Sequence, residues 1–65
     1  MRFRDDTERA IYAACFVARL DSELSQPRPA WFTPIDWRDR AVDIAIGDAI
    51  NVVQMHRDGV KRRAR

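Results

Sequence analysis

The stretch Phe32-Thr33-Pro34-Ile35-Asp36-Trp37 (residues 32–37) decides the fold, because it combines four signals for the start of a helix. Thr33 suits the N-cap, and Pro34 suits the first helical position, where its missing N–H would have no partner inside the helix. Asp36 holds the third position as a shorter capping-box residue, and the aromatic residues at the two ends of the stretch have the spacing of a hydrophobic staple. The stretch therefore predicts a helix that begins at residue 34.

This helix is expected to run to residue 58, since Gly59 suits the left-handed conformation that closes many helices. An upstream helix is predicted from Asp5-x-x-Glu8, which has the spacing of a capping box. Two prolines between the helices exclude helical structure there. The chain is therefore predicted to be a single all-α domain, an antiparallel hairpin made of helix 5–24, linker 25–33, helix 34–58 and basic tail 59–65.

The composition limits the classes of protein to which the chain can belong. Its 65 residues, 46% hydrophobic and 34% charged, suffice for one small domain. With one cysteine (Cys15) and one histidine (His56), neither a disulfide nor a Cys/His zinc site can form within one chain. The sequence contains no glycine-rich phosphate loop and no nucleophile elbow, so we expect no enzyme, no catalytic residue, no cofactor and no metal site.

The N-terminus lacks the pattern of a signal peptide, and the longest apolar run, residues 10–18, is too short for a bilayer. We therefore expect a cytoplasmic protein without a membrane span. Three aspartates at helical spacing, Asp36, Asp39 and Asp43, suit either a shared cation or ion pairs with Arg38 and Arg40. Ion pairing is the simpler interpretation.

The apolar faces of the two helices exceed what a single hairpin can cover. Alanines recur at every fourth position in each helix, and small side chains predict that these two ridges meet in a close antiparallel pair. The ridges comprise Ala10, Ala14 and Ala18 in the first helix and Ala41, Ala45 and Ala49 in the second. The larger residues of the second helix then predict a homodimeric four-helix bundle. The expected dimer interface is Val42, Ile46, Ala49, Ile50 and Val53.

Two further groups of residues are candidates for recognition. The first contains aromatic residues and arginine, which binding hot spots favour, namely Tyr12, Phe16, Arg19 and Trp31. Burial beneath a partner subunit is the alternative for the Tyr12–Phe16 pair. The second group is the basic tail, with Lys61, Arg62, Arg63 and Arg65 as candidates for phosphate contacts. A solvated, frayed terminus is the alternative for the tail.

These observations favour a non-catalytic regulatory protein that forms a homodimer and binds a larger protein, which it inhibits. The small size is typical of accessory factors encoded by phages and mobile elements. The alternative is a small dimeric regulator that binds nucleic acid weakly through the basic tail. Residues 1–60 carry eight basic and ten acidic residues, so the excess of positive charge lies entirely in the last five residues.

Overall fold

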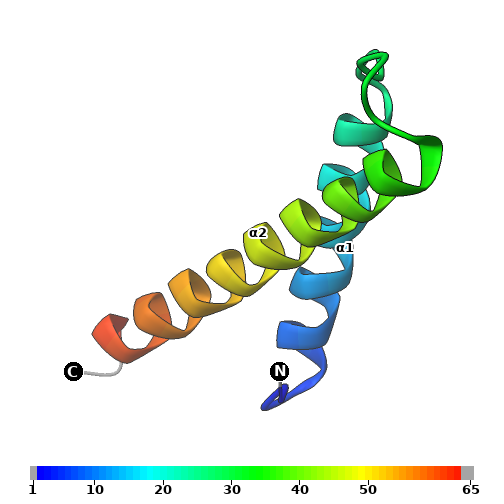
Figure 1. The fold of residues 1–65 in the computed structure, drawn as a ribbon. Helices are drawn as coiled ribbons and strands as arrows, with labels where there is room; N and C mark the ends of the chain where they lie inside the picture. Colours follow the sequence, from blue (N-terminus) through cyan, green and yellow to red (C-terminus); the bar gives the residue numbers. More distant parts are fainter. Residues whose placement is uncertain (1, 64–65) are drawn as a thin grey trace.

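The computed structural model describes residues 2–63, which form two antiparallel helices joined by one connecting segment (Figure 1). Helix α1 spans Asp6–Leu24 and helix α2 spans Pro34–Arg63, and no strand occurs within residues 2–63. The predicted all-α hairpin is therefore confirmed. In the part of the chain that the structure describes, neither helix has the length and apolar character needed to cross a bilayer.

Both helix starts use the side chains that the sequence indicates. The carboxylate of Asp5 accepts a hydrogen bond from the backbone N–H of Glu8 at 2.9 Å, which caps α1. At the start of α2, the hydroxyl of Thr33 accepts from the backbone N–H of Asp36 at 3.1 Å. The rings of Phe32 and Trp37 meet edge to face with centroids 5.2 Å apart, as a hydrophobic staple requires.

The predicted end of α2 is wrong. The helix continues through Gly59 to Arg63, and no glycine in the described residues has a positive φ. A glycine inside a helix costs only about 1 kcal/mol relative to alanine, and the residues that follow it form helix well. Cations in the last turn also interact favourably with the helix dipole. Residues 59–63 of the basic tail are therefore a helical extension of α2.

The core is narrow and comes from one side of α2. Its fully buried apolar side chains are Ala41, Ala45, Ala49 and Val53. Half-buried side chains of α1 lie opposite, and most of them are larger, namely Ile11, Tyr12, Cys15, Phe16 and Leu20. Small residues of one helix thus receive large residues of the other.

The predicted pairing of two alanine ridges is wrong for α1. Ala10, Ala14 and Ala18 are exposed, and Val17 beside them is 62% exposed. Burial stabilises in proportion to apolar area, and a phenylalanine or tyrosine removes far more area from water than an alanine does. Helix α1 therefore turns its aromatic side toward α2 and leaves its alanines outside.

The molecule is long and thin, with extents of 52 × 17 × 15 Å. Its radius of gyration is 14.7 Å, whereas a compact domain of this length has one of about 11 Å. The helices cross obliquely, and the last turns of α2 extend away from α1 (Figure 1). The segment before α1 packs against both helices. Phe3 meets Tyr12 of α1 edge to face, and Arg57 of α2 donates a hydrogen bond to the carbonyl of Arg2.

Candidate functional site

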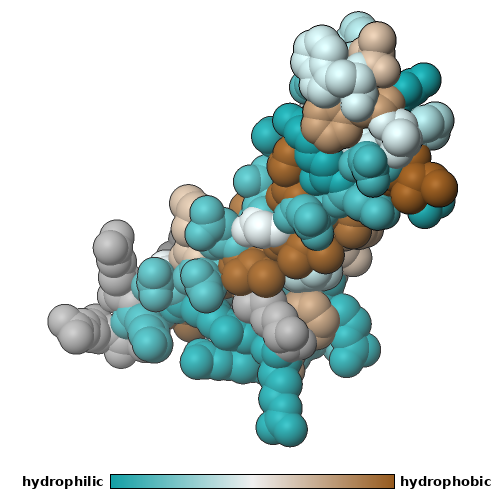
Figure 2. Space-filling model, viewed as in Figure 1, coloured by the Kyte–Doolittle hydropathy of each residue, from teal (hydrophilic) through white to brown (hydrophobic). Residues whose placement is uncertain are grey.

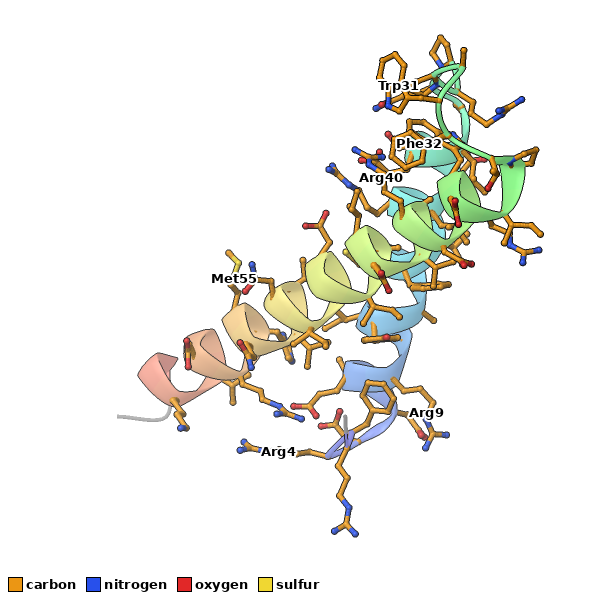
Figure 3. The ribbon with its side chains drawn as sticks, in the orientation of Figure 1. Arg4, Arg9, Trp31, Phe32, Arg40 and Met55 are labelled. Carbon is orange, nitrogen blue, oxygen red and sulfur yellow. The ribbon has the colours of Figure 1, made fainter. Side chains whose placement is uncertain are left out.

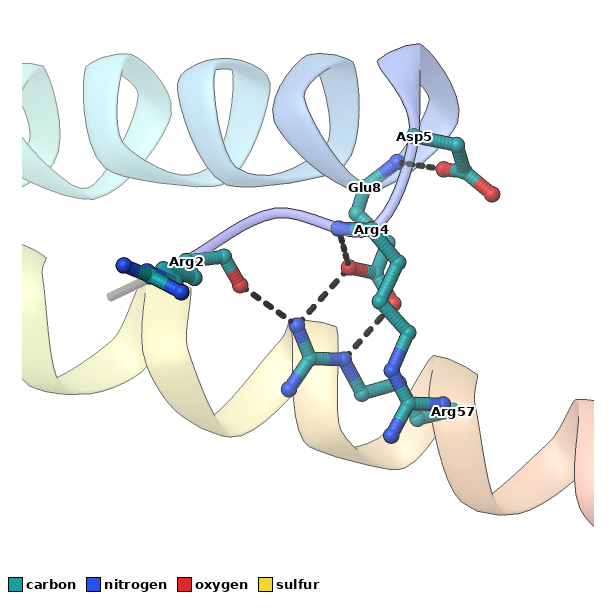
Figure 4. Close-up of polar contacts among 5 residues, drawn as sticks. All are labelled: Arg2, Arg4, Asp5, Glu8 and Arg57. Carbon is teal, nitrogen blue, oxygen red and sulfur yellow. Dashed lines mark hydrogen bonds and ion pairs between the residues drawn. The ribbon is translucent and has the colours of Figure 1, made fainter.

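The most extensive polar network joins the start of α1 to the end of α2 (Figure 4). The guanidinium of Arg57 donates twice to the carboxylate of Glu8, from Nε at 2.6 Å and from Nη2 at 2.8 Å. The same Nη2 donates to the carbonyl of Arg2 at 2.8 Å, and the backbone N–H of Arg4 donates to Glu8 at 2.6 Å. This network fixes the N-terminal segment against α2.

The network strongly favours the charged form of the Glu8 carboxyl. Glu8 is only 3% exposed. Hydrogen bonding from Arg57 lowers the pKa of Glu8 from 4.5 to about 2, against the opposing effect of burial. The hydrogen bond with Glu8 in turn raises the pKa of Arg57. The pair is therefore a fixed ion pair at neutral pH, and no proton moves between its members.

A second buried carboxylate lies near the other end of α1. Glu23 is 4% exposed and pairs with Arg19 at 3.0 Å and with Arg40 of α2 at 3.2 Å. Arg40 also lies over the ring of Trp37, with 4.8 Å between its guanidinium carbon and the ring centroid. The sequence predicts pairing of Arg40 with neighbouring aspartates, but its guanidinium binds Glu23 of the opposite helix.

The two buried glutamates together fix how the helices are aligned. Each lies on the side of α1 that faces α2, and each has an arginine partner near the corresponding end of α2. Moving one helix past the other by a turn would separate both pairs, which would leave Glu8 without an arginine partner and Glu23 with Arg19 alone. Losing one partner of a buried pair is strongly destabilising, so these pairs favour a single antiparallel register.

The N-terminal network also borders a small pocket between the segment before α1 and the last turns of α2. Arg4, Asp5, Glu8, His56, Arg57, Val60 and Lys61 line it. Glu8 and Arg57 neutralise each other in this lining, whereas Arg4, Asp5 and Lys61 are exposed. The exposed part of the lining therefore contains two cations and one carboxylate.

The four predicted partner-binding residues do not lie together. Tyr12 and Phe16 are half-buried on the side of α1 that faces α2, and their rings stack with centroids 6.2 Å apart. Arg19 is bound to Glu23 and also to Asp48, at 3.0 and 3.4 Å. Trp31 alone is strongly exposed, at 83%, and projects from the connecting segment (Figure 3).

The predicted dimer interface is divided in the same way. Ala49 and Val53 are fully buried against α1, so they have no surface left for a second copy in this conformation. Val42 and Ile50 are half-buried, and Ile46 between them is 36% exposed. These three residues, one helical turn apart, form an apolar ridge along the edge of the hairpin, which we call the α2 ridge.

The candidates for phosphate contacts lie at the far end of α2. Lys61 is exposed, and Arg62 and Arg63 belong to the last helical turn. Arg65 lies outside the described residues. The structure adds two arginines that the sequence analysis missed, Arg2 and Arg4, because the N-terminal segment lies beside this end of α2.

The glutamate–arginine pairs were also missed, although the sequence contains a signal for them. Glu8, Tyr12, Cys15, Arg19 and Glu23 recur at spacings of three and four, which places them along one side of a helix. The alanine stripe on the opposite side is the stronger apolar pattern, so the prediction placed that side, and not the glutamate side, against the second helix.

Comparisons with known proteins do not supply a function. No family model matches the chain, and no curated protein and no solved structure is significantly similar to it. Across residues 2–63, no three His, Cys, Asp or Glu side chains are placed to share a metal ion.

Proposed function

We propose that this chain is a non-catalytic cytoplasmic regulator that forms a homodimer and binds a larger protein, which it inhibits. One observation carries the proposal: the hairpin hides very little of its own apolar surface. Among residues 2–61, whose burial the structure describes, the four fully buried apolar residues are three alanines and one valine. Several large apolar side chains lie exposed in the described part of the chain, namely Val17, Leu24, Trp31, Ile35, Ile46, Val52, Met55 and Val60.

The position of these side chains supports association. Apolar side chains gather along the middle of the hairpin on the face seen in Figure 2. Large exposed apolar patches on small proteins mark interaction sites, and a chain of this size usually needs a second subunit to complete its core. A binding role also agrees with the small size, which is typical of accessory factors of phages and mobile elements.

The homodimer is proposed to form through the α2 ridge, Val42, Ile46 and Ile50. A two-fold axis would place the ridge of one copy against the same ridge of the other, as a self-complementary interface requires. This arrangement is the four-helix bundle that the sequence predicts, and it uses only side chains that the hairpin leaves accessible.

The surface proposed for the larger protein comprises Trp31 in the connecting segment and the exposed apolar side of α1. Tryptophan is strongly enriched among residues that dominate binding energies. The hairpin leaves the side chain of Trp31 exposed to solvent. Val17 and Leu24 extend the apolar side of α1 toward the same end of the hairpin. Inhibition then follows if this surface covers a functional site of the partner.

The test separates dimerisation from partner binding with two variants. Ile46→Glu places a charge in the α2 ridge, and Trp31→Ala removes the exposed indole. Sedimentation equilibrium should give a dimer mass for the wild type and Trp31→Ala and a monomer mass for Ile46→Glu. A wild-type mass equal to one chain at micromolar concentration contradicts the homodimer.

Partner binding is measured by quantitative capture from the native host, with Asp39→Asn as a surface control. The proposal predicts that one protein is retained by the wild type and the control but not by Trp31→Ala. The activity of that protein should fall when the purified chain is added. It fails if every captured protein is retained equally by all variants at unchanged helicity.

A further inference from the structure

The positive charge of this molecule is concentrated at one end by the fold. Residues 2–12 and 50–63, which meet at the N-terminal network, hold seven basic and four acidic residues. Residues 13–49, which include the connecting segment, hold four basic and six acidic residues. The hairpin is therefore polarised along its length, with net charges of +3 and −2 in the two parts.

The basic end is assembled from two segments that are far apart in the sequence. Arg57 binds both Glu8 and the carbonyl of Arg2, and this holds the N-terminal segment against the last turns of α2. Arg2 and Arg4 of that segment and Lys61 of α2 are exposed. We call this composite surface of Arg2, Arg4 and Lys61 the basic end, and Arg62 and Arg63 follow Lys61 in the last helical turn.

The carboxylates at this end do not cancel its charge. Glu8 is fully engaged by Arg57, and Asp5 caps the N-terminus of α1. Asp6 and Asp58 are exposed as well, but the cations of this end outnumber all four carboxylates, and Arg2, Arg4 and Lys61 face solvent. A cluster of exposed cations attracts a polyanion, and the strength of the attraction depends on salt.

We propose that the basic end binds the phosphate backbone of duplex DNA, with the last turns of α2 lying in the major groove. Arginine predominates among the cations, and its planar guanidinium matches the geometry of a phosphate. The last turns of α2 extend away from α1 (Figure 1), and the N-terminal segment covers only one side of them. A helix is about 10–12 Å across and fits a groove about 12 Å wide, so the uncovered side can enter the groove. Arg2 and Arg4 then reach the phosphates beside the groove.

This proposal is independent of the protein-binding function, because the basic end shares no residue with Trp31 or the α2 ridge. It also differs from binding by a tail alone. If residues 61–65 act by themselves, Arg2 and Arg4 make no difference. If the composite surface binds, the N-terminal arginines contribute about as much per residue as those of the helix.

The experiment titrates a fluorescent duplex of random sequence with the full chain over a series of salt concentrations. Phosphate contacts by the three residues of the basic end and by Arg62 and Arg63, about five in all, predict a slope of about −4.5 in log K against log salt. The double variant Arg2→Gln/Arg4→Gln should reduce the magnitude of the slope by about 2 and weaken binding by about tenfold or more at about 50 mM salt. The matched control Arg28→Gln/Arg38→Gln removes the same charge from the opposite end and should leave the slope unchanged.

The proposal is overturned by no binding at about 50 mM salt, by equal losses in the two double variants, or by an unaffected Arg2→Gln/Arg4→Gln protein. A single-stranded RNA and vesicles of phosphatidylcholine with phosphatidylserine are the competing probes. Preference for either over the DNA duplex also overturns it. Circular dichroism of every variant establishes that the hairpin is retained.

Discussion

Substitution of Ala45 by leucine tests the orientation of α1 directly. Ala45 is fully buried against α1, so the three added carbon atoms must displace side chains or move the helices apart. Overpacking of this kind destabilises by about 1–3 kcal/mol. Since alanine and leucine have nearly equal helix propensities, the change in packing dominates the effect.

The matched control is Ala14→Leu on the exposed side of α1. Ala14 occupies the same kind of position in its helix, but its side chain faces solvent. A surface substitution of this kind changes stability by no more than about 0.5 kcal/mol. The two variants therefore have the same chemistry and opposite surroundings.

Thermal and urea unfolding followed by circular dichroism measure the difference. A loss of 2 kcal/mol lowers the Tm of a domain this small by about 8–16 °C. Each variant is measured at two protein concentrations a factor of ten apart, which separates intrachain stability from any contribution of association. Equal destabilisation by Ala14→Leu and Ala45→Leu at both concentrations would refute the orientation and restore the pairing of two alanine ridges.

Three further predictions follow from the helix end and the ion pairs. Gly59→Ala should raise the Tm by about 4–8 °C, because the added methyl group meets nothing within 4 Å and the helix gains about 1 kcal/mol; a lower Tm would indicate a left-handed cap. The pKa of Glu8 is lowered to about 2 in the folded state, so its stabilising effect is complete above about pH 5 and is lost as the pH falls to about 2. In urea unfolding, Glu8→Gln should therefore reduce this acid-dependent loss, and an unchanged pH profile contradicts the network. A double-mutant cycle of Glu23→Gln and Arg40→Gln should give a coupling of about 0.5–1 kcal/mol, since Arg40 is 40% exposed, and zero coupling contradicts the pair.

The helices could be predicted because their starts depend on local chemistry. Capping by Asp5 and Thr33 needs only residues within one turn, and the structure confirms both. The Pro-containing linker is equally local. The end of α2 could not be predicted from Gly59, because a glycine suits both a left-handed cap and the interior of a helix. The energy difference between these states is about 1 kcal/mol, which the neighbouring residues decide.

The orientation of α1 could not be predicted from the pattern of apolar residues. Alanine is the best helix former and is equally suited to a close contact and to an exposed surface. A stripe of alanines therefore indicates helix but not burial. Tyr12 and Phe16 decided the orientation through their larger apolar area, and Glu8 and Glu23 lie on their side because arginines of α2 neutralise them.

The basic end depended on tertiary structure in a different way. The sequence shows a basic tail, whereas Arg2 and Arg4 stand 57 or more positions before Lys61. Only the path of the N-terminal segment, held by Arg57, brings them to that tail.

The arrangement of the core accounts for the arrangement of the surfaces. Buried glutamate–arginine pairs specify the register at each end of the hairpin, so the middle needs only small residues on α2 to bring the helices together. The exposed apolar residues of α2 and the alanine side of α1 are then not needed for contacts within the hairpin. Ion pairs align the two ends of this hairpin, and its apolar sides remain accessible. Such a chain can bind other apolar surfaces without refolding. In the proposed homodimer, the stability of the hairpin and the association of its copies therefore depend on different residues, and each can be altered alone.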